Sequence, residues 1–251
     1  MKPYLSVVIP TYNEEAGIRQ SLARVFAFLE GKDYPFEVLV VDDGSEDKTT
    51  AVAEEFFGKR PELQLIKNPH KGKGFAVRTG VLAAKGNFVL FSDADLSTPI
   101  EDVDRFLMWL RDHDFSVAIA SREGFGSKRV DEPWSRHFLG RGFNFLVQLL
   151  VLSGINDTQC GFKLFTKKAA ADIFSRLYIY GERVGEIKHA YMGAFDVEVL
   201  FLAQKLGYKI KEVPVTWQYA ETQRLNPVLD SWRMFLDILR VRISDLRGVY
   251  K

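Results

Sequence analysis

Three groups of polar residues in this chain follow short apolar runs and carry side chains that suit metal ions and phosphates. They are PTYNE at residues 10–14, DDGS at residues 42–45 and DAD at residues 93–95. Two carboxylates one residue apart, as in DAD, repel each other unless a cation lies between them. Carboxylate oxygens suit Mg²⁺ or Mn²⁺, and such an ion can neutralise a diphosphate leaving group. The DAD triplet therefore predicts a divalent metal site at Asp93 and Asp95 that acts on a phosphorylated substrate.

The DDGS group taken alone also fits a turn between a strand and a helix, because Gly44 allows a tight bend. Both interpretations stay open for this group by itself. Three such groups at three expected strand ends favour one common ligand site over three unrelated turns.

The sequence around these groups alternates β-branched runs with helical stretches, which is typical of a parallel sheet covered by helices. We expect a doubly wound, Rossmann-like α/β fold with a mostly parallel sheet flanked by helices. The expected strands are 4–10, 36–42, 63–67, 87–92 and 115–121, and the expected helices are 14–30, 48–59, 74–84 and 99–112. Ligands bind such sheets at the carboxyl ends of the strands, so the three polar groups should meet in one crevice.

The second half of the chain begins with a long polar loop. The expected elements are the loop 121–134, a helix at 134–152, strands at 161–166 and 208–217, a helix at 194–205 and a final helix at 227–247. No internal repeat or linker is visible, so we expect one continuous domain. The final helix combines apolar residues at helical spacing with several arginines. This pattern fits a helix that lies in a lipid interface and equally one that packs on the domain with its arginines in water.

The composition is that of an ordinary globular protein: 47% of the 251 residues are hydrophobic and 27% are charged. This excludes the disulfide-rich and disordered classes. The 34 basic and 33 acidic residues give a net charge of +1, so no general attraction to nucleic acid is expected. The chain has one cysteine, Cys160, so no internal disulfide is expected. Its four histidines do not show ligand spacing, so no zinc site is expected. No apolar run is long enough to span a membrane, so no bilayer span is expected. We expect a cytoplasmic protein, with a peripheral position on the cytosolic face of a membrane as the alternative.

Longer motifs carry a resemblance to a known family. The segments VVIPTYNEE, VVDDGSEDKT, KGKGFAVRTG and FSDADLSTP, in this order and spacing, resemble the nucleotide-sugar domain of the family-two inverting glycosyltransferases, which have the GT-A fold. In the second half, ASR at 120–122, DTQCGFKLF, FDVEVLFLA and EVPVTW followed by TQRLN resemble the polyprenyl-phosphate hexosyltransferases, and within them the dolichyl-phosphate β-glucosyltransferases. The resemblance covers the whole chain as a single GT-A domain over 1–251. It implies a nucleotide-sugar half at 1–122 and an acceptor-side half at 123–251, which ends in the amphipathic helix.

The resemblance assigns roles to the residues that would surround the nucleoside. It implies that Pro10, Tyr12 and Glu14 border the nucleoside and that Asp43 forms a hydrogen bond with the base edge. Lys73 stands where related enzymes place a basic residue, so it would contact the base or the phosphates.

The resemblance also assigns roles to the DAD triplet. Asp93 would lie over the ribose or the metal, Asp95 would bind the metal directly, and Ala94 would belong to the same nucleotide-sugar site. Some mannosyl relatives carry Gln where this chain has Ser97, so the identity of a third metal ligand stays open.

The acceptor side requires positive charge. A lipid phosphate has its second pKa near ~6, so it is mostly dianionic at neutral pH and can attack the anomeric carbon without a strong general base. Cations must then hold this phosphate against the repulsion of the diphosphate. Arg122, Lys163 and Arg224 lie in the matching motifs, so we expect them to be phosphate contacts in the catalytic site. Other cations stand nearby in the sequence: Lys128, Arg129, Arg136 and Arg141.

Asp157 is the remaining catalytic candidate. It could orient Lys163 or a sugar hydroxyl, or act as the base if the acceptor were an alcohol, and it also fits an ordinary turn residue. Asp196 and Glu198 are expected to support the site without contacting substrate.

We therefore expect a metal-dependent inverting hexosyltransferase that moves glucose from UDP-glucose to a polyprenyl phosphate such as dolichyl or undecaprenyl phosphate. A GDP-mannose donor, a different acceptor and a nucleotide-sugar-binding protein without catalysis are the alternatives. A dinucleotide-binding oxidoreductase is excluded because no G-x-G-x-x-G follows the first strand.

Overall fold

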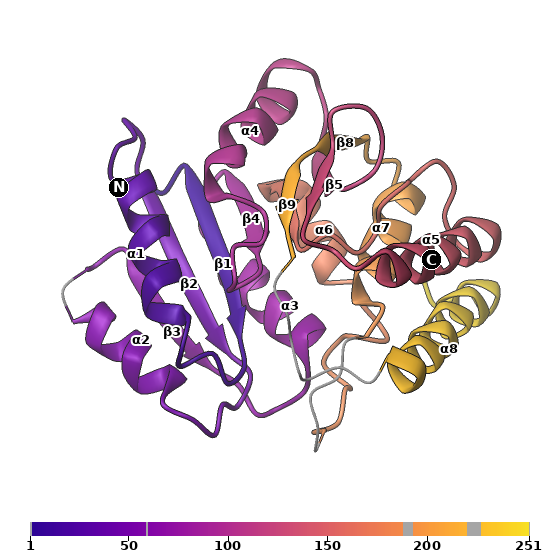
Figure 1. The fold of residues 1–251 in the computed structure, drawn as a ribbon, viewed down its shortest axis with the longest axis horizontal. Coiled ribbons are helices and arrows are strands. Elements are labelled where there is room, and N and C mark those ends of the chain that lie inside the picture. Colours follow the sequence, from indigo (N-terminus) through magenta and orange to yellow (C-terminus); the bar gives the residue numbers. More distant parts are fainter. Residues whose placement is uncertain (1, 59, 188–192, 220–226, 251) are drawn as a thin grey trace.

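The computed structural model is built around a seven-stranded sheet with the strand order β3-β2-β1-β4-β7-β5-β8 (Figure 1). It describes residues 2–58, 60–187, 193–219 and 227–250. The strands of this sheet are β1 (Leu5–Thr11), β2 (Phe36–Asp42), β3 (Leu63–Lys67), β4 (Phe88–Ser92), β5 (Val117–Ser121), β7 (Phe162–Thr166) and β8 (Ile210–Pro214). Strand β7 runs antiparallel to its neighbours β4 and β5, and the other pairs are parallel. The expected doubly wound, mostly parallel sheet is thus confirmed.

Helices cover both faces of the sheet because successive strand residues point to opposite faces and are apolar on both. Val7 and Ile9 pack with helices α1 (Ile18–Leu29), α2 (Thr49–Phe57) and α4 (Val103–Asp112), which follows the short helix η1 (Ile100–Asp102). Val8 packs in the second core, on the opposite face. The helices there are α3 (Lys73–Ala83), α5 (Trp134–Leu150), α6 (Lys167–Phe174), α7 (Phe195–Lys205) and α8 (Pro227–Leu246).

The expected elements of the first half agree with the structure to within a few residues, whereas the second half differs in two places. The expected strand 208–217 is divided: β8 ends at Pro214, and β9 (Thr216–Gln218) pairs with β6 (Lys128–Val130) in a separate two-stranded sheet. A proline has no N–H for a sheet hydrogen bond, so continuing the ladder there is unfavourable. Helix α6 was not expected. The sequence feature that could have predicted this helix is Thr166, whose side chain accepts a hydrogen bond from the Ala169 N–H and caps the helix.

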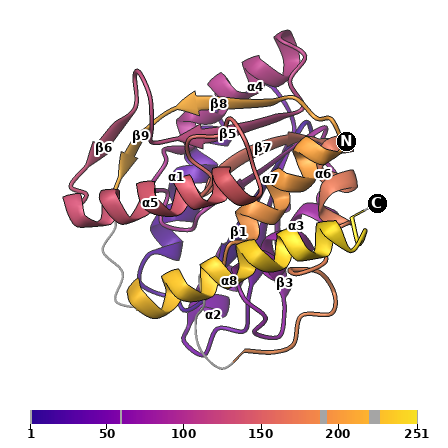
Figure 2. The same cartoon turned by 90° about the vertical axis from the view of Figure 1, so that its right-hand side faces the viewer.

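Helices α5 and α8 lie side by side on the face turned toward the viewer in Figure 2. Each buries a narrow strip, which includes Val147 of α5 and Ile238 and Val241 of α8, all 0% exposed. The outer sides of the same helices carry large apolar residues that remain exposed. These are Trp134, Phe145 and Leu149 on α5 and Trp232, Ile243 and Leu246 on α8. Among the described helices, none has the length and apolarity that crossing a bilayer requires.

The contact between α3 and the sheet depends on a glycine. A Cβ atom on Gly80 would lie 2.4 Å from Val8 Cγ1 and 2.8 Å from Val41 Cγ2, both fully buried. We expect Gly80→Ala to destabilise the fold by about 1–3 kcal/mol, because the added methyl group forces α3 away from β1 and β2. Gly140→Ala in α5 is the matched control, because nothing lies within 4 Å of its Cβ position. It should be neutral or stabilising, and urea unfolding of the two variants checks the difference.

Candidate active site

The loops that follow β1 and β2 are joined by hydrogen bonds between their polar residues. Thr11 and Asp42, which end these strands, are paired in register. Beyond them, the Asn13 N–H donates to Ser45 Oγ at 2.9 Å, and the Glu46 N–H donates back to Asn13 Oδ1 at 2.8 Å. The Glu14 N–H donates to Thr49 Oγ1 at 2.7 Å. The PTYNE and DDGS groups therefore form one structure, as the strand-end rule predicted.

Asp43 is buried at the centre of this structure. Its carboxylate accepts hydrogen bonds from the Lys71 N–H at 3.0 Å, from the Gly72 N–H at 2.8 Å and from His70 Nδ1 at 2.8 Å. Burial raises the pKa of Asp43, although these hydrogen bonds oppose the rise. The imidazole of His70 also stacks on the ring of Tyr12, with centroids 4.0 Å apart and planes 5° apart. Sequence reasoning tested His70 only as a zinc ligand and missed this position.

Lys73 and Asp93 bring the start of α3 to the end of β4. Lys73 Nζ lies 2.5 Å from Asp93 Oδ1. Burial alone would lower the pKa of Lys73, but the charges of Asp93, Asp196 and Asp95 outweigh it, so the pKa of Lys73 is raised. Gly161 leaves room for the Asp93 carboxylate, because a Cβ atom there would lie 2.0 Å from Asp93 Oδ2. The glycine of the DTQCGF motif thus positions the first carboxylate of DAD.

The other members of DAD differ in exposure. Asp95 is exposed, and its Oδ1 accepts the Ser97 N–H at 3.0 Å, whereas Ala94 is 8% exposed. Asp93 Oδ1 is buried against Lys73 Nζ, whereas the Asp93 side chain as a whole remains 31% exposed at the crevice. Two such carboxylates fit Mg²⁺ or Mn²⁺, which take oxygen ligands and share their coordination with substrate phosphates and water. Within the described ranges no three acidic, histidine or cysteine side chains gather as a complete metal cage.

Lys163 lies inside the protein and not at the crevice surface. Its side chain is 0% exposed, and Nζ donates to the Cys160 carbonyl at 2.7 Å and to the carboxylate of Asp196. Burial raises the pKa of Asp196, against the effect of Lys163 and Lys73. A buried ammonium that already has two acceptors does not fit a direct phosphate contact. Lys163 instead holds Asp196 in place, so the expectation that it touches phosphate does not agree with its position.

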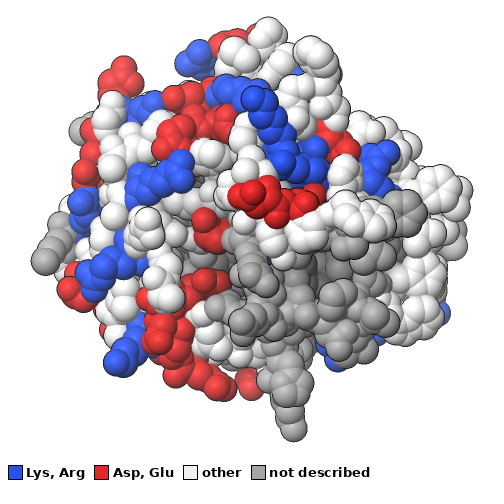
Figure 3. Space-filling model, viewed as in Figure 1, with Lys and Arg blue, Asp and Glu red and all other residues white. Residues whose placement is uncertain are grey.

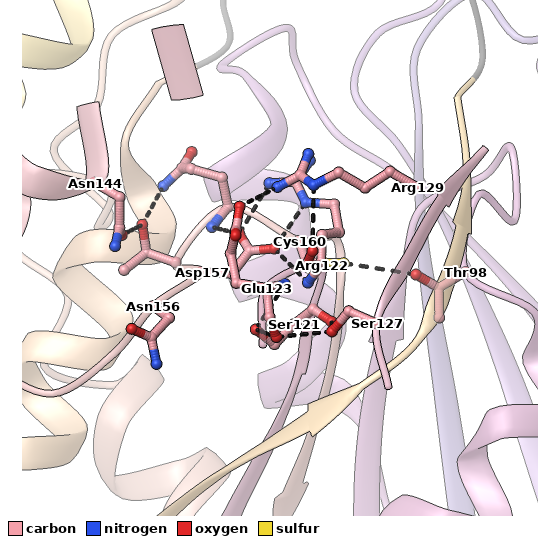
Figure 4. A network of polar contacts seen from close by, with 12 residues as sticks. Thr98, Ser121, Arg122, Glu123, Ser127, Arg129, Asn144, Asn156, Asp157 and Cys160 are labelled. Carbon is pink, nitrogen blue, oxygen red and sulfur yellow. Dashed lines mark hydrogen bonds and ion pairs between the residues drawn. The ribbon is translucent and has the colours of Figure 1, made fainter. Parts of the chain in front are cut away.

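Arg122 and Asp157 form a nearly buried ion pair with two parallel bonds (Figure 4). Arg122 Nε lies 2.7 Å from Asp157 Oδ2, Arg122 Nη2 lies 2.9 Å from Asp157 Oδ1, and the Arg122 N–H also donates to Oδ2 at 2.9 Å. The guanidinium lowers the pKa of Asp157 to about 2, although burial opposes this. Asp157 thus orients Arg122 and not Lys163, and a carboxylate with so low a pKa is a poor general base.

Strand β6 and helix α5 place further basic side chains around one carboxylate, that of Glu123, whose contact with Arg129 is drawn in Figure 4. Arg129 Nη2 lies 2.6 Å from Glu123 Oε1, His137 Nε2 lies 3.4 Å from the same oxygen, and Arg141 Nη1 lies 3.5 Å from Oε2. Glu132 binds the other side of Arg129 at 2.5 Å. The polar loop expected at 121–134 is therefore an ordered network next to the Arg122–Asp157 pair.

Four residues named in the sequence analysis need a separate statement. Pro10 is buried within β1, where it pairs in register with Val41 of β2. Glu14 is partly buried, and its backbone carbonyl accepts the N–H groups of Gly17 and Ile18 at the start of α1. Arg224 and the side chain of Arg136 lie outside the described residues.

Comparison with known proteins decides the family. The model of glycosyl transferase family 2 matches residues 6–174, which is more than half of the chain. This chain belongs to glycosyl transferase family 2. The glycosyltransferase is 36% identical to the dolichyl-phosphate beta-glucosyltransferase of Dictyostelium discoideum, over 99% of this chain and 76% of that protein. It is 38% identical to the mouse (Mus musculus) protein of the same name, over 98% of this chain and 77% of that protein.

Solved structures agree with the GT-A fold of this family 2 glycosyltransferase. Glucosyl-3-phosphoglycerate synthase from Mycobacterium tuberculosis, solved with Mn²⁺, UDP-glucose and phosphoglyceric acid, gives a TM-score of 0.65 at 19% identity and covers 96% of this chain and 79% of its own. A mannosyltransferase from Pyrobaculum calidifontis, solved with GDP-mannose and Mn²⁺, gives 0.58 at 22% identity and covers 96% of this chain and 65% of its own. The division of the chain at residue 122 and the individual site roles stay predictions.

Replacing Asp157 by Asn should weaken the fold in a pH-dependent way. The variant leaves the Arg122 charge without its partner, so we expect a loss of about 3 kcal/mol at neutral pH. The folded-state pKa of Asp157 is depressed from 3.8 to about 2. Its stabilising effect is therefore fully present above pH ~4–5 and is lost as the pH falls toward 2.

Urea unfolding of the wild type and Asp157→Asn between pH 2 and 7 measures this contribution. The two stabilities should converge at the acidic end, where Asp157 becomes protonated and resembles Asn. A difference that stays constant over this range would contradict the assignment.

Proposed function

We propose that this chain is an inverting glucosyltransferase that moves glucose from UDP-glucose to a polyprenyl phosphate such as dolichyl phosphate, with the help of Mg²⁺ or Mn²⁺. Full-length similarity to dolichyl-phosphate beta-glucosyltransferases supports the glucosyl group and the lipid acceptor. A structural neighbour solved with Mn²⁺ and UDP-glucose is consistent with this donor and metal. The observation that carries the proposal is the placement of Asp93, Asp95 and Lys73 beside the joined loops of β1 and β2.

The donor end has the charges that a nucleoside diphosphate requires. Asp93 and Asp95 would hold the metal ion, which supplies positive charge to the diphosphate as it leaves. Lys73 carries a raised pKa and stays protonated at neutral pH, so it can contact the diphosphate directly. Asp43 and Tyr12 border the space expected for the base.

The acceptor end favours a phosphate over an alcohol. An alcohol must lose its proton to a base, and Asp157 was the candidate for that role. Its carboxylate is bonded to Arg122, and its pKa is about 2. A phosphate dianion needs no such base, and Arg141, which is half exposed and only loosely paired with Glu123, can supply a positive charge to it. In-line attack of a phosphate oxygen on the anomeric carbon, with departure of UDP, inverts the configuration of the sugar.

The test of this function is calorimetric binding of UDP, UDP-glucose and GDP-mannose, each with Mn²⁺ and with EDTA, followed by product detection with a short polyprenyl phosphate. Metal-dependent binding of the uridine ligands and a glucosyl phospholipid product are expected. Preference for GDP-mannose would move the enzyme to mannosyl transfer. Absence of metal-dependent nucleotide binding would contradict the proposal.

Asp95→Asn should lower glucosyl transfer at least ~100-fold while leaving the fold intact, because Asp95 is exposed and a carboxamide binds Mg²⁺ or Mn²⁺ much more weakly than a carboxylate. Asp114→Asn is the matched control. Asp114 is also exposed, at the end of α4, and pairs only with Lys209 among the described contacts. Initial rates of both variants against UDP-glucose give the comparison, and equal rates would remove Asp95 from the metal site.

We further propose that the outer face of α5 and α8 rests on the cytosolic side of a membrane. The polyprenyl phosphate lies at headgroup depth, so the enzyme must approach a lipid surface. On this face Arg141, Phe145 and Leu149 follow one another at intervals of four residues along α5, and they line a surface hollow of about 300 Å³ with Asn144 and Gln148. Arg240 and Arg242 on α8 are also exposed. The right-hand edge of Figure 3, where α5 lies, is largely uncharged.

Exposed aromatic and aliphatic residues with arginines beside them are typical of a helix that lies in an anionic lipid interface. The double variant Phe145→Ser with Leu149→Ser should therefore reduce sedimentation with vesicles of phosphatidylcholine and phosphatidylserine at least ~10-fold, since about two apolar side chains leave the interface. Met108→Ser on α4, where Met108 is 39% exposed, should sediment like the wild type. Equal sedimentation of all three proteins would contradict the membrane face.

A further inference from the structure

The imidazole of His70 occupies a position with the chemical character of a nucleobase site. One ring face stacks on Tyr12 at 4.0 Å, and Nδ1 lies 2.8 Å from the Asp43 carboxylate. A carboxylate only accepts hydrogen bonds, so Nδ1 carries the proton and donates it. A uracil base would use the same two contacts, since it is a flat ring with an N3–H donor. His70 therefore makes, inside the free protein, the contacts that the proposed function assigns to the base.

The three hydrogen-bond donors to Asp43 differ in how easily a ligand could displace them. Two are the backbone N–H groups of Lys71 and Gly72, which are fixed by the loop that starts α3. The third is the side chain of His70. A base that brings its own N–H to this carboxylate can take the place of His70 with the least change, because one side-chain rotation releases the site.

The backbone of His70 is held while its ring can turn. The backbone nitrogen of His70 packs against Gly44, which has φ +77°. A Cβ atom added to Gly44 would lie 2.9 Å from this nitrogen. The His70 carbonyl accepts the Ile187 N–H at 2.9 Å. These contacts fix the loop and leave rotation about the Cα–Cβ bond of His70 as the available movement.

Two further observations favour displacement of the ring over insertion of a base beside it. Rings stacked at 4.0 Å leave no room for a third ring between them, because each stacking contact itself requires roughly this spacing. In addition, His70 Nε2 is buried and has no hydrogen-bond partner among the described residues. A buried nitrogen without a hydrogen-bond partner costs free energy, and this cost is removed when the ring moves to a position where water can bind Nε2.

We propose that His70 fills the nucleobase subsite of the free enzyme and that the donor base must displace it, which makes His70 a determinant of donor affinity. The inference rests on the proposed function, which supplies the nucleotide ligand and assigns its base to Tyr12 and Asp43. It distinguishes His70 from an ordinary base contact, because a base contact strengthens nucleotide binding whereas a competing side chain weakens it.

The test is calorimetric binding of UDP with Mn²⁺ to the wild type, to His70→Ala and to His113→Ala. Removing the competing ring should tighten UDP binding by at least about fivefold, because one charge-assisted hydrogen bond and one stacking contact no longer have to be broken. His113 is exposed at the end of α4, so His113→Ala should bind like the wild type. Pyrophosphate with Mn²⁺ has no base and should bind wild type and His70→Ala equally.

A second measurement follows the His70 ring in the wild type directly. In the wild type, the ring protons of His70 should show an upfield NMR shift from the Tyr12 ring, and this shift should disappear when UDP is added. His70→Ala identifies the signal among the four histidines of the chain.

Weaker or unchanged UDP binding by a folded His70→Ala, or a His70 signal that UDP does not move, overturns this inference while the proposed function stands. If UDP binds to none of the three proteins, the proposed function fails with it. Tighter binding together with loss of the upfield shift supports both.

Discussion

The crevice of this enzyme depends on alternating charges that are held in a fixed order below its surface. Lys163 is fully buried and bound to Asp196, while Lys73 lies against Asp93 and feels the charges of Asp196 and Asp95. A buried ammonium or carboxylate is costly unless an opposite charge or several hydrogen bonds compensate it. The four side chains therefore form a series in which each charge holds the next one in place. It runs from Lys163 on β7 through Asp196 on α7 and Lys73 on α3 to Asp93 at the end of β4.

This order explains why motifs far apart in the sequence are needed together. Asp93 fits its position because Gly161, from the DTQCGF motif, has no side chain to exclude it. Lys163 of the same motif reaches Asp196 at the start of α7. The antiparallel strand β7, which lies between β4 and β5, carries both residues to the DAD triplet. Removing either contact would leave a charged group with reduced compensation inside the protein.

The acceptor side is organised by a different buried pair, and this pair limits the chemistry. Asp157 uses both carboxylate oxygens to orient Arg122, and Glu123 gathers Arg129, His137 and Arg141. Carboxylates engaged in this way are better at holding cations than at accepting protons. A charged acceptor that is already deprotonated suits such a site. The apolar outer face of α5 lies on the same helix as Arg141, so the proposed lipid-facing surface is beside this cation.

Much of the fold, and the meeting of the three polar groups at one edge of the sheet, follow from the sequence by itself. Apolar runs ending in PTYNE, DDGS and DAD predict strand ends, and strand ends of a parallel sheet meet at one edge. The direction of a side chain that lies within a strand is harder to predict from the sequence, since it depends on which neighbouring element covers each face of the sheet. Lys163, which lies within β7, was expected to contact phosphate in the crevice, and it is instead buried in an ion pair with Asp196.

Only the tertiary structure decided the partners of charged and aromatic side chains. The stacking of His70 on Tyr12 joins residues that are 58 positions apart, and no local pattern marks it. The same holds for α8, whose apolar residues at helical spacing were compatible with two opposite orientations. The structure buries Ile238 and Val241 and leaves Trp232 and Leu246 exposed. Local sequence determines that a helix forms and how its apolar residues are spaced, whereas the surface of the neighbouring elements determines which of them become buried.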